Sequence, residues 1–317
     1  MALPTSGTIS LEEIKDEFGG DPQDGLTEYY RGGGRVPDTS NNSSVPTSGT
    51  IKLTDFYGAG NLLAETIAYM DEVASQGGTI RDVGQVNDVM SYLLEQGLYD
   101  DVVYAYDFTA GGYKADGSDR VYEAYDLVPA YNHSINSQGT QRPELVSDGF
   151  EFNPSDQTWL TTGLSTTFSD WTLLMWVKMP DPDAGTWLGI TGYTGLSARY
   201  IFLRKPEGET HRIYYRNGAL SYVSQVPPSP HFNEDWVMVA VRGVDSTDIR
   251  FFLNNVWHNR VFVPDGEDTQ LRSDHIGRLR NGNHFNGIIG KVILLQTPIN
   301  LAPAWEFFNK TRHHYGV

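Results

Sequence analysis

The sequence predicts a mainly β protein: a C-terminal two-sheet antiparallel sandwich, preceded by a short helical connector and an extended N-terminal segment. Three observations lead to this prediction. The 317 residues include 33 glycines and 12% aromatic residues but only 20% charged residues, a composition typical of chains with many strands and turns. Apolar residues follow a helical period over 62–98. Beyond residue 104 they alternate, or form short apolar runs between turn residues.

The first predicted unit, residues 1–60, contains an internal repeat. Pro-Thr-Ser-Gly-Thr-Ile occurs at 4–9 and returns unchanged at 46–51. A short segment ending in glycine follows each copy, and Ser10 with Glu13 forms a capping-box pattern, which predicts brief helices stopped by glycine. Isolated helices shorter than about 12 residues are marginal in water. We therefore expect this unit to order against a partner protein, although a flexible leader is the alternative suggested by the polar run 38–44.

The anchors of this docking segment would be its regularly placed apolar and aromatic residues: Leu11, Ile14, Tyr29, Tyr30, Leu53, Phe56 and Tyr57.

The second predicted unit, residues 61–106, carries one basic and eight acidic residues. Two apolar stripes at helical spacing, one over 63–74 and one over 80–93, are separated by Gly77-Gly78. The pattern is compatible with a helical hairpin or oligomerising stalk, which would make the protein a homo-oligomer. It is equally compatible with two helices that pack on the next domain.

The third predicted unit, residues 107–317, contains twelve predicted strands: 149–153, 159–162, 172–179, 187–193, 199–204, 211–216, 220–224, 236–242, 248–253, 256–262, 275–279 and 287–296. The runs 173–177 and 237–241 are apolar on both faces, so we expect them at the centre, with Trp176, Val177, Val239 and Val241 buried. Asn254-Asn255 predicts a tight hairpin turn, because Asn tolerates positive φ. Many short strands without intervening helices predict two packed sheets.

Composition excludes several classes of function. A net charge of −17 and a pI near 4.7 argue against a nucleic-acid surface. The absence of cysteine excludes disulfides, thiolate metal sites and cysteine nucleophiles, and suits a reducing compartment. No apolar stretch of about 18 residues occurs, so we expect no membrane insertion, and the N-terminus lacks the pattern of a secretion signal.

The acidic residues and histidines do not form a catalytic pattern. A retaining glycosidase needs two carboxylates about 5 to 5.5 Å apart, as alternate positions of a strand provide. Glu267 and Asp268 are adjacent in a turn-like run, and Glu207 and Glu209 lie in a loop. The eight histidines, which include His313-His314 at the tail, share no metal-ligand spacing. We therefore predict no enzymatic activity, no metal and no cofactor.

Residues of the third unit carry a family resemblance. They are Phe150-Glu151-Phe152 and Trp159-Leu160, the segments 168–178 and 251–256, and the pair 276–278 and 285–292. Together they resemble laminin-G-like (concanavalin A-like) jelly-roll domains over about residues 120–317. The resemblance implies a jelly roll. Because some of these relatives bind calcium at the rim, a calcium site using oxygens of Asp274, Asn281 and Asn283 remains open.

The N-terminal repeats also carry a resemblance. Both copies match Pro-Thr-Ser-Gly-x-Ile-x-Leu-x-acid-Phe/Ile, and Tyr-Tyr-Arg-Gly-Gly lies between them. Residues 4–60 are in this respect similar to a leader of bacteriophage virion proteins. The two resemblances imply a tail or head appendage, assembled in the host cytoplasm, that joins other virion proteins and displays a lectin-like domain toward a host-surface glycan. A head-decoration or connector protein with a purely cementing sandwich is the alternative.

Surface aromatic residues are the predicted glycan contacts, since an aromatic face can stack on a sugar ring. The candidates in the middle strands and loops are Trp187, Tyr193, Tyr200, Tyr215 and Tyr222. Successive strand residues face opposite sides, so one of Tyr214 and Tyr215 should point inward and the other outward.

Overall fold

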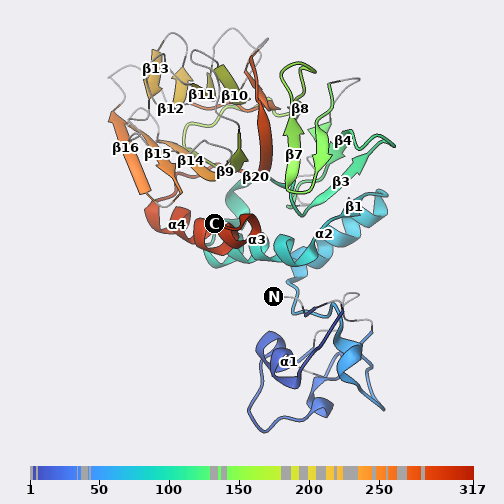
Figure 1. Cartoon of the computed structure of the whole chain (residues 1–317). Coiled ribbons are helices and arrows are strands. Elements are labelled where there is room, and N and C mark those ends of the chain that lie inside the picture. Colours follow the sequence, from blue (N-terminus) through green and yellow to red (C-terminus); the bar gives the residue numbers. More distant parts are fainter. Residues whose placement is uncertain are drawn as a thin grey trace.

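Two antiparallel sheets, with helices on one side, make up most of the computed structural model (Figure 1). The structure describes residues 3–4, 6–33, 35–36, 42, 44–128, 135–136, 141–179, 187–192, 199–204, 212–217, 220–223, 235–244, 248–254, 256–262, 270–279 and 283–317. The mainly β sandwich predicted from the sequence is confirmed, and a strand is found at each of the twelve predicted places.

The first sheet contains ten strands in the described residues. Their order is β1 (Thr79–Ile80), β3 (Gly112–Ala115), β4 (Val121–Ala124), β5 (Ile135–Asn136), β8 (Leu160–Thr161), β17 (His275–Ile276), β10 (Trp187–Gly192), β11 (Arg199–Arg204), β12 (Arg212–Asn217) and β13 (Leu220–Val223). A separate pair, β18 (Arg278–Leu279) and β19 (Asn283–His284), follows β17.

The second sheet contains eight strands in the described residues. Their order is β16 (Val256–Phe262), β15 (Asp248–Leu253), β14 (Trp236–Val244), β9 (Trp171–Lys178), β20 (Gly287–Leu295), β7 (Gly149–Phe152) and β6 (Glu144–Val146), and β2 (Val102–Asp107) also pairs with β20. The turn between β15 and β16 has Asn254 at a φ of 51°, which confirms the positive φ predicted there.

The central strands of the second sheet are buried on both faces. Leu173, Met175 and Val177 of β9 belong to the core between the sheets, together with Ile201 and Ile213 of the first sheet. The residues that alternate with them face the helices. Trp176, Val177, Val239 and Val241 are all 0% exposed, as predicted. A helix layer on the outer face explains why these strands are apolar on both sides.

The helix layer consists of α2 (Ala64–Ser75), α3 (Val83–Glu95) and α4 (Leu301–Thr311), followed by the short helix η6 (Arg312–Tyr315). Apolar residues of all three long helices share one core with Leu174, Trp176 and Met238 of the second sheet. The stripe over 80–93 therefore packs within the chain, and the free stalk is wrong. Helix α2 packs there through Tyr69 and Val73 instead of through the stripe predicted over 63–74, whose Ala74 is exposed. None of the described helices is long and apolar enough to cross a membrane.

Two consequences follow for the predicted organisation. The homo-oligomer stays a prediction, but the free stalk from which it was argued is not found, because α2 and α3 share a core with the second sheet. Residues 62–106 also share a core with the sandwich, and β2 begins at Val102, so this part of the chain is not structurally separate from the predicted third unit. The C-terminal helix α4 was not predicted from the sequence.

The N-terminal unit folds around a core of its own. It contains α1 (Leu11–Phe18) and the short helices η1 (Leu26–Tyr29) and η3 (Leu53–Phe56), and its ends meet where Leu3 N donates to Ala59 O at 2.8 Å. Its core residues are Leu3, Ile9, Ile14, Phe18, Tyr29, Val36, Val45, Phe56 and Ala59. The expected extended segment is therefore wrong, because the short helices pack on one another.

The two repeat copies make equivalent contacts inside this unit. Gly7 and Gly49 have φ angles of 96° and 89°. The Gly7 carbonyl accepts a hydrogen bond from the Tyr57 hydroxyl at 2.5 Å, and the Gly49 carbonyl accepts one from the Tyr30 hydroxyl. The repeated phrase thus stabilises the unit internally, because each copy supplies a carbonyl to a tyrosine of a different segment.

The predicted docking residues divide into two groups. Ile14, Tyr29 and Phe56 are fully buried in the unit's own core and cannot contact a partner without unfolding it. Leu11, Tyr30 and Tyr57 are half-buried, and Leu53 is 36% exposed. Those four residues remain available at the surface, to different extents.

A buried carboxyl group in the loop after β4 allows a first test of the fold. Asp126 Oδ1 accepts backbone N–H bonds from Ala105 at 2.9 Å and Val128 at 3.1 Å. Its Oδ2 is buried without a hydrogen-bond partner among the described residues. Burial raises the pKa of Asp126 well above its ordinary value, against the effect of the two N–H donors.

Asp126→Asn is expected to raise the free energy of unfolding at pH 7 by about 1 kcal/mol or more, because Asn keeps the accepting oxygen without a buried charge. The raised pKa means that Asp126 favours the folded state below its ordinary pKa and loses this contribution as the pH rises through the folded-state pKa. The gain from Asn should therefore grow between about pH 4 and pH 7. Urea unfolding at both values measures it, and an equal effect at both would contradict the assignment.

Candidate ligand face

Four neighbouring strands of the first sheet have an unusual charge. Strands β10 to β13 contain the arginines 199, 204, 212 and 216 and no Asp or Glu, whereas the chain as a whole has 40 acidic and 23 basic residues. The same strands contain six aromatic residues: Trp187, Tyr200, Phe202, Tyr214, Tyr215 and Tyr222. The sheet region is therefore locally cationic and aromatic within an acidic protein.

Burial along β12 shows which positions face away from the core. Ile213 and Tyr215 are 0% exposed and belong to the core between the sheets, while Tyr214 between them is half-buried. Because side chains alternate along a strand, Tyr214 lies on the outer face. The predicted split between Tyr214 and Tyr215 is thus confirmed, with Tyr215 inside.

The strand register extends this face across four strands, because directly paired residues share a face. Three rows of paired positions result: Trp187, Arg204 and Arg212; Gly189, Phe202, Tyr214 and Val223; and Tyr200, Arg216 and Ser221. We call the seven aromatic and arginine positions of these rows the arginine–aromatic face. Each row contains at least one aromatic position, and two rows also contain arginine.

The five predicted glycan contacts have different outcomes. Trp187 and Tyr200 occupy positions on the arginine–aromatic face. Tyr215 is a correction: it is buried, its hydroxyl donates to Gln270 O at 2.5 Å, and its ring lies 5.5 Å from that of Trp171, so it cannot stack on a ligand. Tyr222 pairs with Tyr215 and so takes a position on the core face. Tyr193 lies outside the described residues.

A stack of side chains continues the outer face on the neighbouring strand β17. Ile276 is buried between the sheets, so the adjacent His275 lies on the outer side, where it pairs with Gly192 of β10. The Trp159 ring lies 4.7 Å from the His275 ring, and the Arg278 guanidinium lies 3.5 Å from the Trp159 ring centre. This cation–π contact places a half-buried arginine beside the arginine–aromatic face.

Hydrogen bonds fix the orientation of this stack. A guanidinium can only donate, so His275 Nε2 accepts the 2.6 Å bond from Arg278 Nη2, and the ring proton lies on Nδ1, which contacts Asp274 Oδ1. Trp159 Nε1 donates to Gln141 Oε1 at 2.9 Å. Burial lowers the pKa of Arg278, while the charge of Asp274 opposes this change. Hydrogen bonds thus orient both His275 and Trp159, the two rings of the stack.

Glycine at 277 makes this arrangement possible. Gly277 has a φ of 85°, and a Cβ at this position would lie 2.3 Å from the Phe152 ring. Any other residue would displace the backbone between His275 and Arg278, because both the φ angle and the space favour glycine.

The calcium site left open above is not tested by the described part of the chain. Asp274 Oδ1 contacts His275, and Asn281 lies outside the described residues, as does the side chain of Asn283. Sequence reasoning also missed Trp159, Arg278 and the arginines of β11 and β12. The absence of Asp and Glu from these strands can be seen in the sequence and could have indicated the arginines. The stack of Trp159, His275 and Arg278 depends on contacts between separate segments, which the sequence does not show.

Comparisons with known proteins concern the sequence first and then the fold. No protein-family model and no curated protein matches the chain. The solved binding domain of Paraclostridial Mosquitocidal Protein 1 is similar with a TM-score of 0.50 and 16% identity, over 67% of this chain and 52% of that one. At this identity the likeness shows the fold, and it supports the β-sandwich described above. The present chain spans about half the length of that structure.

Two further solved structures are similar at lower scores. The ligand binding domain of botulinum neurotoxin serotype D, in complex with N-acetylneuraminic acid, has a TM-score of 0.49 and 11% identity, over 68% of this chain and 52% of that one. Trypanosoma rangeli sialidase, in complex with sialic acid, has a TM-score of 0.48 and 13% identity, over 69% of this chain and 34% of that one.

Proposed function

We propose that the sandwich is a lectin-like, non-enzymatic module that binds an acidic glycan on its arginine–aromatic face. The observation that carries the proposal is the register of β10 to β13, which places three arginine and four aromatic positions on one outer face without an acid on these strands. Aromatic rings offer apolar stacking surfaces to sugars. Arginine offers a planar pair of donors that matches a carboxylate or sulfate.

The location of this face supports a display role. The second sheet and the helix layer lie between it and the N-terminal unit (Figure 1). We propose that the N-terminal unit attaches the protein to other structural proteins of a phage virion, assembled in the host cytoplasm, while the arginine–aromatic face reaches a host-surface glycan. The repeated Pro-Thr-Ser-Gly-Thr-Ile phrase supports this attachment role through its resemblance to virion leaders.

The glycan proposal is tested with an array of sialylated, uronate-bearing, sulfated and neutral oligosaccharides, followed by calorimetry on the ligands that bind. We expect binding to acidic members that weakens with added salt. Arg216→Ala should lower affinity by at least about tenfold, and Arg216→Lys should recover only part of it, since Lys lacks the planar fork. Tyr200→Ala should also weaken binding.

Arg312→Ala is the matched control, because it removes an exposed arginine on the helix side of the molecule. Its affinity should equal that of the unmodified chain. Equal binding to neutral and acidic sugars would contradict the role of the arginines. Absence of binding across the array would contradict glycan recognition and favour the cementing role. Release of reducing ends from a bound polysaccharide would contradict the non-enzymatic proposal.

Virion attachment is tested separately by removing residues 1–60, whose ends meet at Leu3 and Ala59 and whose core is self-contained. The remaining chain should keep its glycan binding but fail to enter particles. Incorporation at normal copy number would contradict an attachment role without affecting the glycan proposal.

A further inference from the structure

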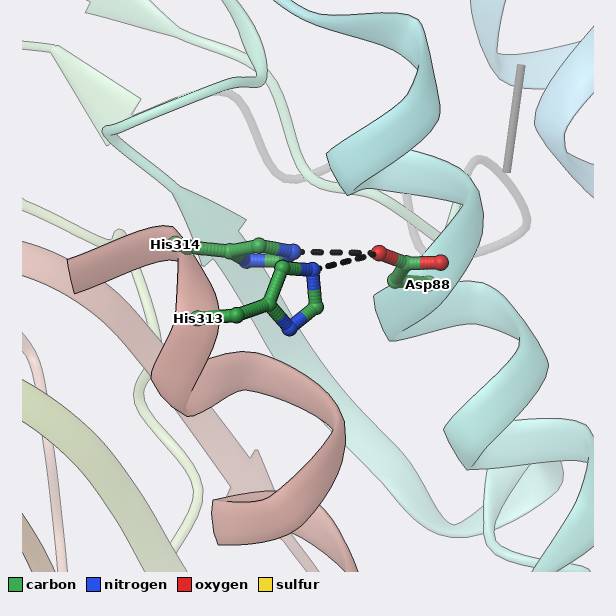
Figure 2. A group of neighbouring side chains, drawn as sticks. All are labelled: Asp88, His313 and His314. Atoms are coloured by element: carbon green, nitrogen blue, oxygen red, sulfur yellow. Dashed lines mark hydrogen bonds and ion pairs between the residues drawn. The ribbon is translucent and has the colours of Figure 1, made fainter. Parts of the chain in front are cut away.

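Two segments far apart in the sequence meet at the helix layer. Asp88 lies on α3, and His313 and His314 lie on η6, just after α4. Figure 2 shows both imidazole rings directed at the same carboxylate. His314 Nε2 lies 3.0 Å and His313 Nε2 lies 3.5 Å from Asp88 Oδ2. In the part of the chain that the structure describes, this is the one such group of three possible metal ligands.

We propose that Asp88, His313 and His314 bind a divalent transition-metal ion, with zinc as the ion that suits this ligand set best. Two imidazoles and a carboxylate are ligands that zinc takes in proteins, at about 2.0 to 2.2 Å. Tetrahedral ligands at such distances are about 3.4 Å from one another. The observed separations of 3.0 and 3.5 Å lie on either side of this value.

The mutual arrangement of the three side chains favours a shared ion. One potential ligand atom from each residue lies within 4.8 Å of the other two. The two imidazole rings are 4.2 Å apart at an interplanar angle of 72°, and both present Nε2 to the same carboxylate oxygen. One ion could therefore contact all three ligands after adjustment of these side chains.

Burial differs among the three ligands in a way that suits an open site. The His314 side chain is 1% exposed, Asp88 is 31% exposed and His313 is 53% exposed. The buried histidine gives a fixed point, and the exposed one leaves a path for the ion and room for a water as fourth ligand. A chain with a net charge of −17 also attracts cations.

The tautomer of His314 is compatible with this role. A neutral imidazole carries one proton, and a metal ligand must be neutral. When Nε2 binds the ion, that proton can reside on Nδ1, which has no hydrogen-bond partner in the described part of the chain.

Such an ion would link the second connector helix to the last turn of the chain. Lys310, which precedes η6 by two residues, already contacts Glu95 and Ser91 of α3 at 2.8 Å. The metal would add a connection from α3 to η6 beside this contact from α3 to α4, and binding to the folded state alone would stabilise that state.

Titration calorimetry with ZnCl₂ on the full chain without a histidine tag tests the site. We expect one zinc per chain and a melting temperature that rises with zinc concentration. His313→Ala should weaken binding by at least tenfold, and Asp88→Asn should weaken it as well. His313 is the leading variant because its side chain is half exposed, so its removal leaves the core intact. Far-UV circular dichroism checks that these variants fold.

Co²⁺ substitution supplies an independent spectroscopic measurement. A four-coordinate cobalt site should give visible absorption in the unmodified chain and lose it in His313→Ala. His258→Ala is the control, since it removes a histidine of β16 that lies outside the group. Zinc binding that His313→Ala leaves unchanged, or that His258→Ala weakens equally, would show adventitious binding only. Failure to bind zinc at all would likewise overturn the proposal, whatever the outcome of the glycan experiments.

Discussion

Lys291→Met is expected to lower the free energy of unfolding by about 3 to 5 kcal/mol, because it leaves an unpaired carboxylate inside the protein. Lys291 Nζ lies 2.6 Å from Asp107 Oδ2, and both side chains are 1% exposed. The two residues are direct partners in the pairing of β2 with β20. Burial lowers the pKa of Lys291, while the charge of Asp107 opposes this change.

The surroundings of the pair are adapted to a charged carboxylate. Asp107 Oδ1 accepts backbone N–H bonds from Thr109 at 3.1 Å and Ala110 at 2.9 Å. The Lys291 ammonium lies 5.4 Å from the Tyr315 ring centre, which adds a cation–π contact. Removal of the lysine alone therefore leaves a negative charge that solvent cannot reach.

Lys310→Met is the matched control for this prediction. Lys310 Nζ lies 2.8 Å from Glu95 Oε1, but the side chains are 25% and 54% exposed. Exposed ion pairs contribute at most about 1 kcal/mol, so this variant should lose much less stability. Urea unfolding followed by circular dichroism compares the two. Similar small losses for both variants would show that the Lys291 pair is solvated.

Trp176→Ala is expected to lower the free energy of unfolding by about 3 to 5 kcal/mol, because it opens a cavity between the second sheet and the helix layer. The Trp176 side chain is fully buried, and its ring lies 4.7 Å from the Tyr315 ring and 5.7 Å from the Phe308 ring. Its Nε1 donates to Thr311 Oγ1 at 2.8 Å. One side chain therefore joins the central strand to the C-terminal helix.

Trp305→Ala provides the comparison on the same helix layer. Trp305 lies on α4 but is 39% exposed, so its removal gives up less buried area, and the loss should be under about 2 kcal/mol. Thermal and urea unfolding of both variants measure the difference. If Trp305→Ala were as destabilising as Trp176→Ala, the helix layer would not be packed as described.

Local sequence patterns were sufficient to predict the strands of the sandwich. Alternation and short apolar runs identified twelve strands, because the period of two along a strand depends on neighbouring residues only. The two-sided apolarity of 173–177 and 237–241 correctly placed β9 and β14 at the centre. The apolar stripes over 63–74 and 80–93 identified helices, because the helical period also depends on neighbouring residues only. Neither the strand pattern nor the helix pattern showed which element each would pack against.

Tertiary structure decided what those faces contact. Helices α2, α3 and α4 cover the outer face of the second sheet, and α2 does so through Tyr69 and Val73 instead of through its predicted stripe. The N-terminal unit buries Ile14, Tyr29 and Phe56 in its own core. An apolar face does not specify its partner, since burial gains are non-directional. Tyr215 was expected at the surface for the same reason, because residue type does not show which side of a strand faces the core.

The proposed metal ligands show most clearly the difference between what the sequence indicates and what only the tertiary structure brings together. Asp88 and His314 are 226 positions apart in the sequence and 3.0 Å apart in the structure. Histidine spacing along the chain detects sites whose ligands lie on one local element, so it gave no sign of a site divided between α3 and η6. Residue types and periods along the chain determine which elements form and what chemistry they carry. Contacts between distant segments form only when the whole chain folds. Each helix or strand buries its apolar face against another element, and that packing decides which side chains of distant segments become neighbours.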